Sequence, residues 1–89
     1  MTTAELRQLV AKIDRIRSLE KQVRAINTLE CNQELTERQE NRRERLENEF
    51  TDIAKSLGLV AEHQRDPRGA ALKLHDQGTN IDSAMGTVL

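Results

Sequence analysis

Apolar residues recur every three or four positions in the first third of the chain. This spacing places them on one face of a helix with 3.6 residues per turn. Thr2 and Glu5 form a capping-box pattern, which predicts that the helix begins near Thr3. The residues that share the apolar face are Leu6, Leu9, Val10, Ile13, Ile16, Leu19, Val23 and Ile26.

A second amphipathic stretch follows a polar segment at residues 27–33, where we expect the first helix to break. Thr36 and Gln39 offer a second capping box. Downstream, the apolar positions step by four, three and four residues, and they are Leu46, Phe50, Ile53 and Leu57. Gly58 comes next, and glycine tolerates the left-handed conformation common just after a helix. The second helix is therefore expected to end at Leu57.

Folded back on each other, the two stretches predict an antiparallel helical hairpin. Their apolar positions face each other at its open end but not near the bend. The expected pairs at its open end are Leu6 with Leu57, Leu9 with Ile53, Ile13 with Phe50 and Ile16 with Leu46. Near the bend, the first helix would face Glu37, Glu40 and Glu44, which cover apolar side chains poorly. The sequence thus predicts an exposed stripe there, formed by Leu19, Val23, Ile26 and Leu29. We interpret this stripe as the core of a homodimer, with docking of another protein's helix as the alternative.

The segments LVAEHQ and AALKLH, separated by a turn signal, predict two short strands. Asp66, Pro67, Arg68 and Gly69 suit a type I turn, because Asp accepts from the backbone, Pro presets φ and Gly closes the turn. An isolated two-stranded hairpin is barely stable in water. Leu72 and Leu74 are therefore expected to pack on the helices or on another subunit.

The expected fold class is mainly α, a coiled-coil-like antiparallel helical hairpin followed by a short β-hairpin and a flexible tail. The expected ranges are 1–58, 59–76 and 77–89. The chain has 89 residues, is 36% hydrophobic and contains one aromatic residue, Phe50, so its core must be mostly aliphatic. Domains of this size often need a second subunit, which agrees with the expected homodimer.

The charge balance argues against two classes of partner. Fourteen basic and 15 acidic residues leave a formal charge of −1, which creates no long-range field for nucleic acid or an anionic membrane. No apolar run approaches the roughly 20 residues that span a bilayer. Cys31 is the only cysteine, which excludes an internal disulfide and favours a soluble cytoplasmic protein with a free thiol.

No pattern typical of an active site is found, so we expect neither an enzyme nor a cofactor. The chain has no Gly-rich phosphate loop, no nucleophile elbow and no isolated carboxylate pair. His63 and His75 could face each other across the strands, but they lack the spacing of zinc ligands, and no metal site is expected. Arg42, Arg43 and Arg45 alternate with glutamates and are interpreted as a solvated face, with phosphate contact as the alternative.

The segment LGLVAEHQRDPRGAALKL resembles part of small proteins encoded by tailed bacteriophages and prophages. Those proteins place a charged helical region before a strand, an Asp-Pro-Arg-Gly turn and a second strand. The resemblance covers roughly residues 57–75, and the downstream GTNIDSAMGTVL departs from the aromatic, Gly-rich continuation of the family. The resemblance implies a phage accessory protein of the host cytoplasm without enzymatic activity.

These observations lead to the hypothesis of a non-enzymatic protein that binds and occludes a host or phage protein, as a host-takeover or anti-defence inhibitor. The expected partner-binding residues are Asp66, Arg68 and Gly69 at the hairpin tip, with Arg42 and Arg45 on the second helix. An exposed arginine at such a tip can bind a carboxylate or a phosphate through two hydrogen bonds. The alternatives are a coiled-coil module in phage morphogenesis and a weak nucleic-acid-binding protein.

Overall fold

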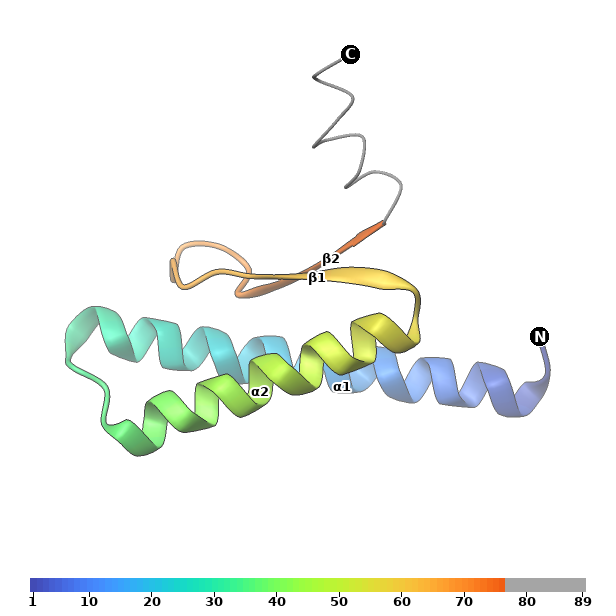
Figure 1. The fold of residues 1–89 in the computed structure, drawn as a ribbon, viewed down its shortest axis with the longest axis horizontal. Coiled ribbons are helices and arrows are strands. Elements are labelled where there is room, and N and C mark those ends of the chain that lie inside the picture. The colour runs from blue at the N-terminus through green and yellow to red at the C-terminus, as the bar shows by residue number, and fades with distance from the viewer. Residues whose placement is uncertain (77–89) are drawn as a thin grey trace, which may run out of the picture.

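The computed structural model describes residues 1–76, which form two helices and two strands. Their bounds are Thr3–Asn32 for α1, Glu37–Ser56 for α2, Leu59–His63 for β1 and Leu72–Asp76 for β2. The two helices run antiparallel in one layer, and the strands lie across that layer (Figure 1). The predicted fold class, a helical hairpin followed by a β-hairpin, is confirmed. The expected tail at 77–89 lies outside the described residues.

Both helices begin where their capping residues predict. The Thr2 hydroxyl accepts a hydrogen bond from the Glu5 backbone N–H at 3.1 Å, and the Glu5 side chain accepts one from the Thr2 N–H. Thr36 and Gln39 make the same reciprocal pair at the start of α2. These bonds satisfy backbone donors that have no partner inside the helix. Local sequence therefore fixes both helix starts.

The first helix ends at Asn32, within the polar segment 27–33 where the sequence predicts a break. Most of this segment is still helical, and polar side chains in it find partners in the rest of the fold. Asn27, for example, is fully buried and donates to the Gln64 carbonyl at 2.9 Å. The second helix ends as predicted, with Leu57 as its C-cap and Gly58 at a φ of 73°.

The two strands form an antiparallel sheet in which Leu59 lies opposite Asp76 and His63 lies opposite Leu72. Alternate residues point to opposite faces. The face turned to the helices includes Leu72, which is in the core, and Leu74, which packs against it. Packing of the β-hairpin on the helices is thus confirmed. At the tip, the Gly69 N–H donates to the Asp66 carbonyl at 3.4 Å and closes the predicted turn.

The hydrophobic core lies between the two helices and the β-hairpin. Its buried members are Leu19, Val23, Ile26, Leu46, Phe50, Ala71 and Leu72. The prediction of an exposed self-association stripe is therefore wrong for Leu19, Val23 and Ile26, which are at most 5% exposed. The physical reason is a second layer: the β-hairpin covers the face that two helices alone would leave open. Leu29, the fourth residue of that stripe, is half-buried.

The open end of the helical hairpin is less closely packed than the predicted pairs require. Leu6 is 51% exposed and Ile13 is 39% exposed, so neither side chain is buried at the positions where pairing with Leu57 and Phe50 is expected. α1 has 30 residues against 20 in α2, and its first turns extend beyond the end of α2 (Figure 1). Leu57 instead lines a hollow together with Leu9.

Candidate functional site: a groove between the two helices

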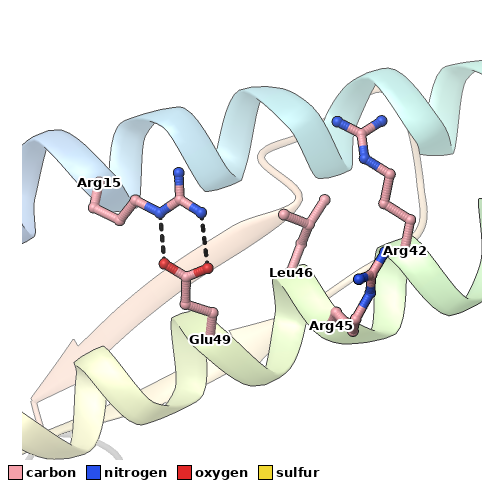
Figure 2. Close-up of a pocket in the computed structure, with 5 residues that line it drawn as sticks. All are labelled: Arg15, Arg42, Arg45, Leu46 and Glu49. Carbon is pink, nitrogen blue, oxygen red and sulfur yellow. Dashed lines mark hydrogen bonds and ion pairs between the residues drawn. The ribbon is translucent and has the colours of Figure 1, made fainter.

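The two helices border an open hollow of about 300 Å³ on the side away from the strands (Figure 2). It is lined by Arg15, Arg42, Arg45, Leu46 and Glu49. Three of these five side chains are arginines, and one is a carboxylate. Arg15 comes from α1 and the others come from α2, so pairing of the helices creates the hollow. Its lining carries a formal excess of positive charge.

Arg15 and Glu49 close one end of this hollow with a two-point ion pair. The Arg15 Nε and Nη2 atoms donate to the two Glu49 carboxylate oxygens at 2.5 and 2.8 Å (Figure 2). These hydrogen bonds lower the pKa of Glu49 and raise the pKa of Arg15, so both groups stay charged. The pair links α1 to α2. It also neutralises one of the three arginines.

Arg42 and Arg45 keep their charges without a carboxylate partner among residues 1–76. Arg42 extends toward α1 and donates to the Gln22 side-chain oxygen at 2.9 Å, which is a neutral acceptor. Arg45 makes no hydrogen bond or ion pair within the described part of the chain. Glu49, four residues further along, turns to Arg15 instead. Two guanidinium groups are thus available to an incoming anion.

A second hollow of about 230 Å³ adjoins the first and shares Arg42 with it. Its apolar lining is supplied by Ala25, Ile26 and Leu29 of α1. Together, the two hollows form what we call the helix groove, with a cationic half around Arg42 and Arg45 and an apolar half around Leu29. Such a surface suits a ligand that carries acidic and aliphatic groups side by side.

Arg43, between the two groove arginines in sequence, has a different role. Its side chain is 2% exposed, and its Nη1 donates to Glu30 at 2.7 Å and to Asn27 at 3.2 Å. The interpretation of this arginine run as a solvated face is therefore wrong for Arg43. Arg43 precedes Leu46 by three positions and Phe50 by seven, which places it on the apolar face of α2. This spacing is the sequence signal that Arg43 faces the core.

The predicted binding residues at the hairpin tip are used to build the turn. The Arg68 side chain is 89% exposed, yet its Nε and Nη2 each lie 3.1 Å from an oxygen of Asp66. The Arg68 side chain, followed by its backbone N–H, lowers the pKa of Asp66. Gly69 allows the Gln64 side chain to lie close to the backbone, because a Cβ at position 69 would lie 2.6 Å from the Gln64 side-chain Nε2.

The tip and the groove belong to different surfaces. The tip is part of the strand hairpin, whereas Arg42 and Arg45 lie on the far side of the helices (Figures 1 and 2). The structure therefore brings Arg42 and Arg45 together with Arg15, and it does not bring them together with Arg68. A contribution of the tip to partner binding stays a prediction.

The two histidines do not face each other. His63 lies opposite Leu72 and His75 lies opposite Val60, which places the two imidazoles on different faces of the sheet. His63 contacts the Thr51 hydroxyl at 3.0 Å, and His75 hydrogen-bonds to Glu62. Residues 1–76 contain no group of three or more side chains placed to hold a metal ion.

Comparisons with known proteins add no relative: no family model, curated protein or solved structure matches the chain. Within the described residues, neither helix combines the length and apolar content needed to cross a membrane. The argument for function therefore starts from the helix groove.

Proposed function

We propose that this protein acts by binding another protein through the helix groove. The observation that carries the proposal is the presence of Arg42 and Arg45, without carboxylate partners among residues 1–76, beside the apolar lining around Leu29. Arginine binds carboxylates through paired hydrogen bonds, and such charge-assisted bonds are stronger than neutral ones. The expected occupant is a protein segment with carboxylates next to aliphatic side chains.

Acidic protein fits the groove better than nucleic acid does. Only two arginines of the lining, Arg42 and Arg45, keep a charge without a carboxylate partner among residues 1–76, which is few for a surface that follows a continuous phosphate backbone. The apolar half would lie against polar sugar and phosphate groups in a nucleic-acid complex, whereas it can cover aliphatic side chains of a protein. The formal charge of −1 also provides no attraction at long range.

We further propose that binding, and not catalysis, is the activity of this chain. The resemblance of residues 57–75 to phage proteins favours a host or phage protein as the partner. A bound chain would cover the partner's surface and thereby block it, which is the expected action of a host-takeover or anti-defence inhibitor. An assembly role in phage morphogenesis would use the same groove on a virion component.

The first experiment titrates the full chain with a synthetic helical peptide that displays Glu and Leu on one face, monitored by amide and guanidinium NMR signals. Shifts are expected at Arg42, Arg45 and Leu29. The double variant Arg42→Glu/Arg45→Glu should weaken binding tenfold or more, because it replaces attraction by repulsion. The control variant Lys21→Glu/Lys73→Glu has the same net charge and alters exposed sites outside the groove lining. It should bind like the unmodified chain.

Three results would overturn the proposal. The first is equal binding of a peptide in which every Glu is replaced by Lys. The second is unchanged affinity of the Arg42→Glu/Arg45→Glu variant. The third is retention of a labelled DNA or RNA duplex at low salt, with displacement of the acidic peptide, which would make the chain a nucleic-acid-binding protein.

A further inference from the structure

The large apolar side chains that are exposed within residues 1–76 all lie in the first part of α1 and just before it. They are Met1, Leu6, Val10 and Ile13, with exposures of 85%, 51%, 49% and 39%. Leu6, Val10 and Ile13 are spaced by four and three residues, so they form one stripe along the helix. We call these three residues the overhang stripe, because the stripe starts in the first turns of α1, which extend beyond the end of α2 (Figure 1).

The overhang stripe is distinct from the side of α1 that meets α2. Leu9 and Lys12 line a hollow with Leu57, so they mark the side of α1 that faces the end of α2. At 100° per residue, the middle of the stripe lies roughly a quarter to a third of a turn from that side. The three aliphatic side chains are therefore available to a further partner.

We propose that the overhang stripe is a two-fold interface between two copies of this chain. The two α1 overhangs would cross antiparallel, with Val10 of each copy near the axis and Leu6 of one copy opposite Ile13 of the other. A two-fold interface requires a surface that is complementary to itself. The spacing of four and three residues on either side of Val10 provides this match.

The charges beside the stripe are also self-complementary. Arg7 and Asp14 lie on the same flank of the stripe, on either side of Val10 along the helix. In the antiparallel arrangement, Arg7 of each copy meets Asp14 of the other, which gives two ion pairs. In a parallel arrangement, this flank of one copy lies on the opposite side of the interface from the same flank of the other copy, so Arg7 and Asp14 would form no ion pair with each other. Neither residue makes a hydrogen bond or an ion pair within residues 1–76, so both are free to pair across the interface.

This charge arrangement is the reason to name a second copy as the occupant. An unrelated protein, or residues 77–89 of the same chain, has no reason to match an Arg and an Asp placed on either side of Val10.

The interface lies away from the helix groove, so a dimer would present two grooves. The proposal does not depend on the proposed function. The sequence predicts a homodimer interface that includes Leu19, Val23 and Ile26, which are buried in the structure. The present proposal places the homodimer interface on exposed residues of the same helix.

The test is sedimentation velocity of the full chain over a wide concentration range at low salt. The unmodified chain should form a dimer as concentration rises. Arg7→Asp alone places two carboxylates opposite each other and should weaken the dimer tenfold or more, and Asp14→Arg alone should do the same with two cations. The double exchange Arg7→Asp/Asp14→Arg restores opposite charges and should restore the dimer.

Two further variants separate the interface from the fold. Val10→Asp changes an exposed residue and should abolish the dimer while the circular-dichroism signal of the helices is kept. Lys21→Asp alters an exposed charge on the same helix beyond the stripe and should leave the dimer unchanged. A chain that stays monomeric at every concentration overturns the proposal, and residues 77–89 or another protein would then be the occupant of the stripe. A double exchange that fails to restore the dimer overturns the antiparallel register, and the proposal with it.

Discussion

The buried guanidinium of Arg43 on α2 forms an ion pair with Glu30 on α1, with 2.7 Å between Arg43 Nη1 and Glu30 Oε1. Only 2% of the Arg43 side chain is exposed, whereas 38% of the Glu30 side chain is. The hydrogen bond from Arg43 lowers the pKa of Glu30 and keeps the carboxylate charged. The Arg43 Nε has no hydrogen-bond partner within residues 1–76. The contact therefore places a cation inside the fold with most, but not all, of its donors satisfied.

Arg43→Ala is expected to lower the free energy of unfolding by about 2–4 kcal/mol, because it removes a buried side chain and leaves Asn27 without its donor. Arg43→Met should cost less, since methionine keeps much of the packing and removes the unsatisfied Nε. Urea unfolding followed by circular dichroism measures both. Arg45→Ala is the matched control on the same helix, and it should change stability by no more than about 0.5 kcal/mol. Equal losses for Arg43→Ala and Arg45→Ala would contradict a structural role for Arg43.

Phe50 should be the most sensitive single position in the core. Its side chain is fully buried, and truncation of a buried phenylalanine to alanine costs about 3–5 kcal/mol. Phe50→Leu should cost about 1.5 kcal/mol or less, because it restores much of the lost volume. Thermal unfolding of dilute protein compares both with Ile13→Ala, which should be much milder since Ile13 is 39% exposed. Similar losses at both positions would support the Ile13–Phe50 pair that the sequence predicts.

The local features of the fold could be predicted because each depends on a few neighbouring residues. Thr2 with Glu5 and Thr36 with Gln39 set the two helix starts by bonds across three positions. Gly58 and the Asp66–Gly69 turn need only their own backbone geometry. The alternating pattern of β2 likewise indicates which leucines face the helices.

Contacts between distant segments could not be predicted in the same way. The sequence does not show that the β-hairpin lies over Val23, because this depends on the direction of the chain after Gly58. The sequence predicts partner binding by Arg42 and Arg45, and the structure places both in the lining of the groove. The sequence does not indicate Arg15, because the carboxylate partner of Arg15 lies 34 positions away. Arg45 lies four positions before Glu49 on α2, a spacing that favours an ion pair along a helix. In the structure, Glu49 instead pairs with Arg15 of α1.

Gly58 offers a test of backbone strain without a steric contribution. Its φ is 73°, and a Cβ built there would meet no atom within 4 Å. Gly58→Ala should therefore lower stability by about 1–2 kcal/mol through the left-handed backbone alone. Gly58→Asn should lose less, because asparagine adopts this conformation more readily. Urea unfolding distinguishes the two, and an unchanged stability of Gly58→Ala would show that the backbone at the end of α2 relaxes.

Glu49 allows the cationic half of the groove to be tested by acid titration. Its pKa is lowered from the ordinary 4.5 by the hydrogen bond and charge of Arg15. The stabilisation from this ion pair is therefore fully present above pH 4.5 and is lost as the pH falls through the lower folded-state pKa. The side-chain carboxyl carbon of Glu49, followed by NMR, should titrate below 4.5. Arg15→Gln should move the midpoint up toward the ordinary value, whereas Arg45→Gln should leave it nearly unchanged. A midpoint that rises in Arg45→Gln and not in Arg15→Gln would restore the local pair along α2 and remove the link between the helices that shapes the groove.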